Sequence, residues 1–147
     1  MPRVIDGDNL LGTWPGRRRS DAEKRALARE VDGLRRREKR RVVLVFDGSP
    51  PPGVSYGADV FFSGPGRKAD ALILEMLRRE NDPRGFTVVT NDRSLADQCR
   101  FVGASVEGVR AFRERLSRDT EGEKPEAAGE LDYWLTQFGG DDPKDSG

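Results

Sequence analysis

The segment VVLVFDG, residues 42–48, contains five consecutive apolar residues that end at an aspartate and a glycine. A strand with one face in water alternates apolar and polar residues, whereas a strand covered on both faces is apolar throughout. The run at 42–46 is of the second kind, which is typical of a parallel sheet with helices on both sides. We therefore expect a buried strand at 42–46 that stops at Asp47 and Gly48.

On either side of this strand, strand-like and helix-like segments alternate along the chain. Strands are expected at 3–5, 42–46, 59–63, 86–90 and 104–107, and helices at 21–37, 69–81, 94–101 and 109–116. An alternation of this kind favours parallel strands joined by crossover helices. The predicted fold is therefore an α/β fold with a mainly parallel sheet and helices on both faces.

The helix at 21–37 has a clear beginning in the sequence. Ser20 starts the tetrapeptide S-D-A-E, a capping box in which Ser20 and Glu23 bond each other's backbone N–H groups. Apolar residues then follow at helical spacing. Before Ser20, the hexapeptide VIDGDN at residues 4–9 is expected to form a turn after the first strand. A loop rich in Gly, Trp, Pro and Arg is expected to follow it.

The chain of 147 residues is long enough for one domain and a tail. We expect a domain at 1–117, a charged linker at 118–129 and an acidic tail at 130–147. The tail contains ELDYWLTQF, residues 130–138, a short amphipathic helix that docks on the body or on a protein partner. The longest apolar run is too short to span a membrane and no signal-peptide pattern precedes VIDGDN, so the prediction is a cytoplasmic protein without a membrane partner.

The formal net charge of zero hides a division between the body and the tail. Residues 1–116 carry 23 Lys or Arg and 17 Asp or Glu, while residues 117–147 carry 3 and 9. A basic body with an acidic extension is typical of a protein that binds a polyanion, although solvated faces also produce such a pattern.

The residue types that are missing narrow the chemistry. The chain has no histidine, and Cys99 is its one cysteine. Triads that depend on histidine, histidine general bases, a disulfide framework and zinc sites of the usual ligand types are therefore excluded. Carboxylates, Lys, Arg, hydroxyl groups or a hard metal ion must carry out any reaction.

Aspartates stand at the predicted carboxyl ends of three strands: Asp6, Asp47 and Asp92. Asp70 lies in the first turn of the helix that follows the strand at 59–63. Ligands of open α/β sheets bind outside the carboxyl ends of the strands, so all four aspartates are expected to face one cleft. Each alone has a structural explanation as a turn or helix cap. Together they require a neutralising cation, and Mg²⁺ or Mn²⁺ accepts oxygen ligands without His or Cys.

Runs of basic residues lie near these aspartates. Arg17–Arg19 follows the first acidic motif, Arg67 and Lys68 precede Asp70, and Arg35–Arg41 ends the first long helix. A solvated face also explains each run and is the favoured interpretation for Arg35–Arg41. Arg17–Arg19 and Arg67–Lys68, however, lie beside the expected cleft and favour a phosphodiester substrate that is bound through its phosphates without sequence specificity.

The motifs VIDGDN, VVLVFDG, GRKADALI and VVTNDRSLADQCRFVGA resemble, in order, those of the NYN domain in its YacP-like branch of bacterial ribonucleases, within the PIN-like nuclease group. The resemblance covers about residues 1–116. It implies a PIN-like, Rossmann-like three-layer α/β/α sandwich and metal-dependent endoribonuclease activity on messenger RNA, in some cases at the ribosome.

The resemblance also implies roles for particular residues. Asp6, Asp70 and Asp92 match the family's metal-binding acids, with Mg²⁺ or Mn²⁺ as cofactor, and Asp47 matches a further acid of the catalytic site. The expected substrate-binding residues are Asn9, Arg17, Arg18, Arg67, Lys68 and Arg93.

The sequence departs from the family pattern at two places. Asp8 occupies a position that is often aromatic in the family, where it adds a charge or another metal contact. The acid that often follows the T-x-D motif is replaced by Arg93 and Ser94, which leaves Asp97 as its substitute.

Two other functions remain open at this stage. In a phosphatase of the haloacid dehalogenase type, Asp6 is the nucleophile, Asp8 the general acid and Lys68 the lysine. Leu10 and the position of Ser49 depart from the motifs of that class. The third alternative is a module that binds RNA or the ribosome without catalysis.

Overall fold

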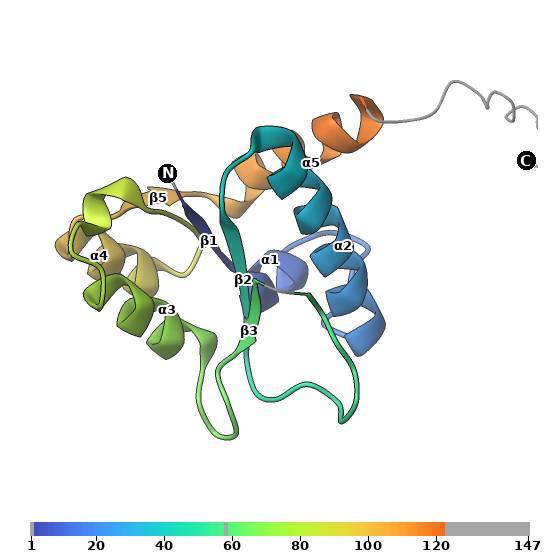
Figure 1. Ribbon diagram of the computed structural model, residues 1–147, viewed down its shortest axis with the longest axis horizontal. Helices are drawn as coiled ribbons and strands as arrows, with labels where there is room; N and C mark the ends of the chain where they lie inside the picture. Colours follow the sequence, from blue (N-terminus) through green and yellow to red (C-terminus); the bar gives the residue numbers. More distant parts are fainter. Residues whose placement is uncertain (1, 58, 123–147) are drawn as a thin grey trace, which may run out of the picture. The chain divides into compact units, whose positions relative to one another are not determined.

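Five parallel strands form one sheet in the computed structural model, which describes residues 2–57 and 59–122. The strands are β1 (Arg3–Asp6), β2 (Val42–Phe46), β3 (Val60–Phe62), β4 (Thr87–Val89) and β5 (Ser105–Glu107). Their order across the sheet is β3-β2-β1-β4-β5 (Figure 1). All four neighbouring pairs are parallel, as the sequence predicts.

Helices cover both faces of this sheet (Figure 1). One face packs against α1 (Gly7–Gly12), α2 (Asp21–Glu38) and the first turns of α5 (Val109–Gly122). The other face packs against α3 (Ala69–Arg78) and α4 (Arg93–Phe101). A short 3₁₀ helix, Pro83–Gly85, precedes β4. The predicted three-layer α/β/α sandwich is confirmed.

The apolar run at 42–46 supplies both cores. Val42, Leu44 and Phe46 belong to the core under α1 and α2, whereas Val43 and Val45 belong to the core under α3. All five side chains are buried. The absence of polar alternation in this run therefore reflects a strand between two helical layers.

The direction of chain winding reverses beside β1. From β1 the chain moves outward through β2 to β3, and it then returns to the other side of β1 to form β4 and β5. The carboxyl ends of β1 and β4 therefore border the switch point, where α/β folds of this kind bind ligands. Asp6 ends β1 and lies opposite Val45 of β2.

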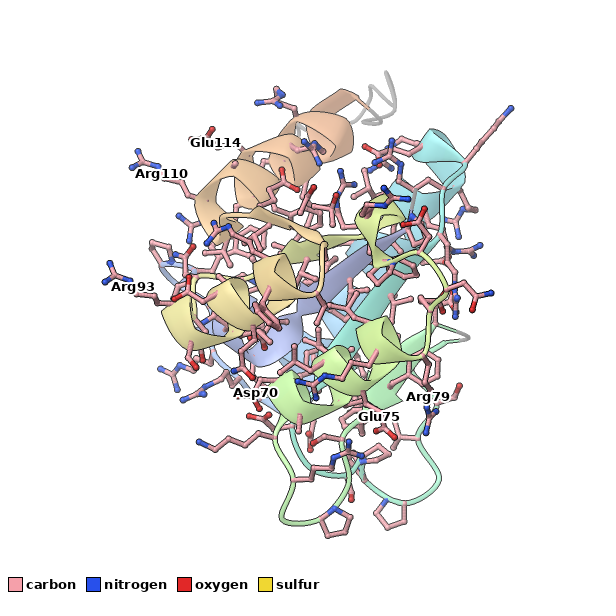
Figure 2. All side chains as sticks on the ribbon, turned by 90° about the vertical axis from the view of Figure 1, so that its left-hand side faces the viewer. Asp70, Glu75, Arg79, Arg93, Arg110 and Glu114 are labelled. Atoms are coloured by element: carbon pink, nitrogen blue, oxygen red, sulfur yellow. The ribbon has the colours of Figure 1, made fainter. Side chains whose placement is uncertain are left out.

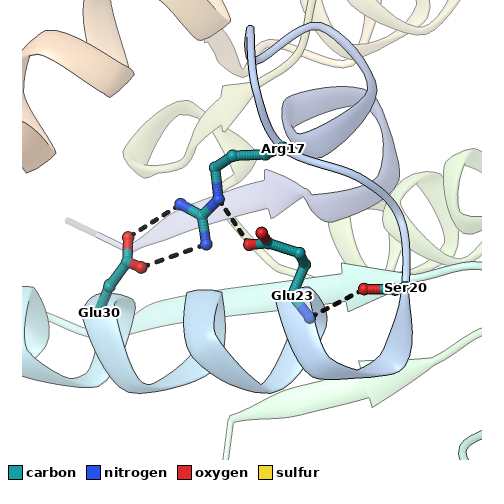
Figure 3. Close-up of polar contacts among 4 residues, drawn as sticks. All are labelled: Arg17, Ser20, Glu23 and Glu30. Carbon is teal, nitrogen blue, oxygen red and sulfur yellow. Dashed lines mark hydrogen bonds and ion pairs between the residues drawn. The ribbon is translucent and has the colours of Figure 1, made fainter.

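The N-terminus of α2 has half of the predicted capping box. The Oγ of Ser20 accepts a hydrogen bond of 3.2 Å from the N–H of Glu23, as expected. The Glu23 carboxylate instead accepts a bond of 2.8 Å from Arg17 Nε. The ion pair with Arg17 thus replaces the second arm of the box (Figure 3).

Helix α1 replaces the turn that VIDGDN was expected to form. It begins directly after Asp6 and buries Leu10 and Leu11 against the sheet. Gly7 is required there by space, because a Cβ at this position would lie 2.5 Å from Cε1 of Phe46. The glycine therefore allows the first turn of α1 to pass over the end of β2.

The chain divides into two units, residues 1–116 and 117–147. Helix α5, which was expected to end at Leu116, continues to Gly122. The rest of the predicted linker and the whole predicted tail lie outside the described residues. In the part of the chain that the structure describes, no helix is both long and apolar enough to cross a membrane.

Candidate functional site

The carboxyl edge of the sheet gathers polar side chains from β1, β2 and β4. Asp6 ends β1, Asp47 follows β2, and Thr90, Asn91 and Asp92 follow β4. The residues after β1 connect to both neighbouring strands through hydrogen bonds. The segment VIDGDN therefore lies at the centre of the candidate site.

Thr90 joins the first and last of the predicted metal ligands. Its Oγ1 donates a hydrogen bond of 3.2 Å to Oδ2 of Asp6 and accepts one of 3.0 Å from the N–H of Asp92. Thr90 is only 2% exposed, so both hydrogen bonds are shielded from water. Asp6 and Asp92 are thus held on either side of one buried hydroxyl group.

Asp92 also caps helix α4. Its Oδ1 accepts a hydrogen bond of 3.1 Å from the N–H of Leu95, so the structural role that the sequence allowed is present. Capping uses one carboxylate oxygen. Oδ2 makes no hydrogen bond or ion pair within the described residues.

Asn9 forms a second link across the switch point. Its Oδ1 accepts a hydrogen bond of 2.8 Å from the N–H of Asn91. Asn91 in turn accepts one of 3.1 Å from the N–H of Val109, at the start of α5. The amide of Asn9 therefore belongs to a network that fixes the chain after β4.

Asp8 faces β2, which neighbours β1 on the side away from β4. Its Oδ2 accepts a hydrogen bond of 2.5 Å from the N–H of Asp47, and its Oδ1 lies 3.7 Å from Nζ of Lys24. The side chain is almost fully buried. Asp8 consequently ties α1, α2 and the end of β2 together.

Asp47 continues this chain of contacts to α3. Its Oδ1 accepts a hydrogen bond of 2.5 Å from the N–H of Ala69, the first residue of α3. The side chain of Ser63 accepts a bond of 3.0 Å from the N–H of Gly48 and donates to the carbonyl of Arg67. The start of α3 is thus fixed relative to the end of β2.

Asp70 lies next to Ala69 in the first turn of α3 (Figure 2). It is partly exposed, and its carboxylate makes no hydrogen bond or ion pair within residues 2–57 and 59–122. Asp47 therefore positions the residue beside Asp70 and leaves the Asp70 carboxylate free for a ligand.

The environment of Asp6 disfavours its negative charge. Burial raises the pKa of this carboxyl to about 6, the hydrogen bond from Thr90 opposes the rise, and the carboxylates of Asp47 and Asp8 add to it. Cys99, in α4, is also buried, and burial raises the pKa of its thiol to about 11. The cysteine is an unreactive core residue, as the sequence suggests.

The predicted substrate-binding cations differ in their surroundings. Arg17 bonds Glu23 and Glu30 and stacks on Trp14, so its guanidinium is held within the fold (Figure 3). Arg67 pairs with Glu75 at 2.5 Å. The other three predicted cations, Arg18, Lys68 and Arg93, are exposed and have no ion pair within the described parts of the chain.

Arg93 and Asp97 both lie on α4 and differ in what they offer the site. Arg93 is the first residue of the helix and projects away from the body in Figure 2. Asp97 is 68% exposed at its side chain and lies 3.6 Å from Arg100, on its own helix. The structure therefore gives no contact that joins Asp97 to the other aspartates.

The predicted trio of metal ligands does not form a closed cage. Among the described residues, no three His, Cys, Asp or Glu side chains lie close enough to hold a metal ion. Mg²⁺ does not require such a cage, because it commonly binds one or two carboxylates and completes its shell with water and phosphate oxygens. Asp6, Asp92 and Asp70 offer oxygen donors of this type, and the nearby carboxylates of Asp8 and Asp47 favour a cation.

Sequence reasoning did not select Thr90, Asn91 or Lys24. Thr90 resembles an ordinary strand residue, and only its position in T-x-D, one residue past β4, could have singled it out. Asn91 caps α5 from a distance of 18 residues, and Lys24 reaches Asp8 from another helix. Such contacts follow from the tertiary structure and leave no local pattern.

The fold and its acidic carboxyl edge together define an α/β domain of the NYN and PIN-like class. The chain belongs to the YacP-like NYN domain family, whose sequence profile matches residues 3–132. This is a family of the nuclease type.

Solved structures of similar fold include two of Rae1 (YacP) from Bacillus subtilis. The W164L mutant superposes with a TM-score of 0.68 at 20% sequence identity, covering 82% of this chain and 77% of that one. The other superposes with a TM-score of 0.67 at 18% identity, covering 83% and 76%. No curated protein sequence matches this chain significantly. At this identity the likeness confirms the fold.

Proposed function

We propose that this protein is a metal-dependent endoribonuclease that cleaves RNA phosphodiester bonds. The observation that carries the proposal is the pairing of Asp6 and Asp92 around the Thr90 hydroxyl, at the switch point of a YacP-like NYN domain. Two acids from neighbouring strands are thereby directed to the edge where α/β folds bind ligands.

In this proposal Mg²⁺ or Mn²⁺ binds one or two of the carboxylates of Asp6, Asp92 and Asp70, and water and phosphate oxygens complete its shell. A bound divalent ion lowers the pKa of water and neutralises charge on the phosphate during hydrolysis. The protein's own part is to fix the acids: Thr90 orients the Asp6 carboxylate and holds the backbone of Asp92, while Asp47 holds the start of α3 beside Asp70. Asn9 keeps the chain after β4 in place through Asn91.

RNA binding in this proposal depends on the exposed cations that have no partner among the described residues. Arg18, Lys68 and Arg93 are the candidates for phosphate contacts at the acidic edge. Arg17 and Arg67 act instead through the ion pairs that shape their loops. Contacts of this type give affinity that falls with salt and carries no base specificity.

The family suggests messenger RNA as the substrate and a translation-associated setting, with the ribosome as a partner and the cytoplasm as the location. These finer assignments are part of the proposal. The acidic region after residue 117, including the segment at 130–138, is proposed as the part that contacts the body or a protein partner.

The phosphatase alternative fits the contacts less well. Its general acid would be Asp8, but this carboxylate accepts the Asp47 N–H and lies beside Lys24. Both of its carboxylate oxygens therefore face groups of the fold, the Asp47 N–H and Lys24. The position of Asp8 therefore favours the nuclease.

The test is RNA cleavage by the purified protein with Mg²⁺, Mn²⁺ or EDTA, and by Asp92→Asn. Asparagine still caps α4, so the substitution removes a ligand charge and keeps the helix start. Cleavage is expected to need the metal and to fall about 100-fold or more in the variant. The matched control is Asp97→Asn, which removes the same charge from an exposed position of the same helix.

Three results would contradict the proposal. Equal loss in both variants would show that Asp92 has no special role. Salt-sensitive RNA binding without any cleavage would identify a binding module. Hydrolysis of p-nitrophenyl phosphate, with phosphate analogues trapped on Asp6, would identify the phosphatase.

A further inference from the structure

A second region with cavities lies away from the acidic edge, between α2 and the edge strand β3. It begins as a cavity of about 440 Å³ whose apolar wall consists of side chains from α2, β2 and β3: Ala28, Val31, Val42, Leu44 and Val60. Figure 1 shows the segment that joins β2 to β3 returning on the α2 side of the sheet. Tyr56 and Gly57 of this segment close the cavity.

A basic cavity of about 430 Å³ continues from the apolar one. The two share Arg35, Arg36 and Asp59. The second is otherwise lined by Lys39, Arg40 and Arg41. We call the two cavities together the α2–β3 groove. It uses the run Arg35–Arg41, which the proposed active site leaves unexplained.

Several cations of the groove are available to an anion. Arg29, Lys39 and Arg40 have no hydrogen bond or ion pair from their side chains within the described residues. Arg35 and Arg36 share one carboxylate, that of Asp32. Arg41 lies 3.5 Å from Asp59. Exposed pairs of this kind contribute little stability, so phosphate oxygens can replace their carboxylates.

Tyr56 gives the apolar cavity an aromatic side chain. Its ring packs edge-on against Phe62, with 5.0 Å between ring centroids. Its hydroxyl is buried and has no hydrogen-bond partner in the described structure.

Lys39 occupies a position that normally favours glycine. It is the C-cap of α2 and has a φ of 53°, in the left-handed region. Lysine is strained there because its Cβ approaches the backbone, whereas glycine is not. Glycine fills such a cap with less strain, so Lys39 can be replaced by glycine without loss of the cap.

We infer that the α2–β3 groove binds a single-stranded segment of the RNA substrate, with one base in the apolar cavity and the neighbouring phosphates on Lys39, Arg40 and Arg41. An aromatic platform beside a cationic track is the usual design for single-stranded nucleic acid. This inference rests on the proposed function, because it assigns a second contact for the same substrate.

The groove lies toward the opposite edge of the sheet from the candidate active site. It is lined by Val42, the first residue of β2, while Asp47 follows the last. Strand rise places these positions roughly 16 Å apart. RNA that occupies both regions must therefore be several nucleotides long, and a very short RNA reaches only one of them.

The test compares Lys39→Gly/Arg40→Gln with the control Arg78→Gln/Arg79→Gln. Both pairs remove two positive charges from the end of a helix, α2 or α3. RNA binding is measured by fluorescence anisotropy as a function of salt, with RNA of about 16 nucleotides and of about 4 nucleotides. Thermal unfolding confirms that each variant is folded, and Lys39→Gly is expected to leave the cap intact.

The groove variant is expected to bind the longer RNA roughly tenfold more weakly at about 0.1 M salt, with a salt slope smaller by about 1.4 for two lost phosphate contacts. Cleavage of the short RNA is expected to be unchanged. Tyr56→Leu is expected to weaken binding of the longer RNA by a similar factor through lost stacking. The control pair keeps the affinity of the original protein.

Equal weakening in the groove and control variants would overturn the inference, because total charge alone would then set the affinity. Unchanged binding of the longer RNA, with AMP raising the unfolding temperature only when Tyr56 is present, would also overturn it and identify a small nucleotide as the occupant. Failure of the protein to cleave any RNA would refute the proposed activity, while the binding comparison would still decide the groove.

Discussion

The Oγ1 of Thr90 donates a hydrogen bond of 3.2 Å to Oδ2 of Asp6, although the two residues are 84 positions apart in the chain. Because the same oxygen accepts from the N–H of Asp92, its proton is available for Asp6. The hydroxyl therefore sets the orientation of one proposed metal ligand and the backbone position of the other. Thr90 is a positioning residue for the site.

Thr90→Val is expected to lower metal-dependent RNA cleavage by about 10- to 100-fold, the usual effect of losing a group that orients a ligand. Valine has almost the same shape but cannot bond Asp6 or the N–H of Asp92. The loss of two buried hydrogen bonds is expected to lower the free energy of unfolding by about 1 to 3 kcal/mol. Cleavage rates over a range of Mg²⁺ concentrations and urea denaturation measure the two effects.

Thr90→Ser is the matched control, because it keeps the hydroxyl and loses one methyl group. It should retain most of the activity and require no more metal than the original protein. If valine and serine reduce cleavage equally, packing rather than the hydrogen bonds is responsible, and the positioning role is wrong.

The raised pKa of Asp6 predicts how stability depends on pH in EDTA. With a pKa of about 6 in the folded state and 3.8 as its ordinary value, the folded protein holds a proton that the unfolded chain has already lost. The free energy of unfolding therefore falls as pH rises from about 4 to about 6. A shift of about two pKa units corresponds to a loss of about 3 kcal/mol by neutral pH.

Asp6→Asn removes this loss while keeping an oxygen that accepts from Thr90. Without metal the variant is expected to be more stable than the original protein by up to about 3 kcal/mol at pH 7.5, and equal to it near pH 4. Urea denaturation at several pH values tests this. Added Mg²⁺ should stabilise only the original protein. A variant that is less stable at every pH would show that burial does not raise the pKa of Asp6.

Gly7 and Gly12, at the two ends of α1, form a natural pair for testing the local packing. A Cβ at Gly7 would lie 2.5 Å from Cε1 of Phe46 and 3.0 Å from the carbonyl oxygen of Val45. Gly7→Ala is expected to lower the free energy of unfolding by about 1 to 3 kcal/mol, because the ring and the backbone must shift. Denaturant titration measures the change.

Gly12→Ala is the control, since the nearest atom to its Cβ would be 3.7 Å away, on the flexible side chain of Arg19. It should be neutral within about 0.5 kcal/mol. Gly7→Ala with Phe46→Leu should recover part of the loss at Gly7. Similar losses at both glycines would mean that α1 depends on glycine for its backbone conformation instead.

Most of the fold follows from patterns within single segments. The strand at 42–46 is found at its predicted bounds, and the order of strands and helices is as expected, because buried parallel strands and amphipathic helices have distinct periods. Helix α1 was not predicted, since six residues are too few to show a helical period. Its Gly-Asp-Asn beginning instead matches the composition of a turn.

The candidate site was predictable only in part. The positions of Asp6, Asp47 and Asp92 at strand ends follow from the parallel topology. Their partners do not, because contacts such as Arg17 with Glu30 or Asp8 with the Asp47 N–H form between elements that meet only after folding. Sequence therefore predicts which edge of the sheet is acidic but not which acids are free.

Asp8 distinguishes the nuclease from the phosphatase most directly, because the nuclease does not need it as an acid. In the original protein the Asp47 N–H donates to Oδ2 of Asp8 over 2.5 Å. Asp8→Asn keeps an oxygen that accepts this bond and loses the attraction to Lys24. We expect RNA cleavage within about tenfold of the original rate and a loss of about 1 kcal/mol in the free energy of unfolding. Asp8→Leu removes the acceptor as well and should be destabilised by about 3 kcal/mol or more, since a buried N–H is left without a partner. Cleavage assays and denaturation of both variants test the structural role. If Asp8→Asn is as stable as the original protein but cleaves no RNA, the carboxyl group takes part in the reaction, and the assignment of Asp8 to the framework of the site is wrong.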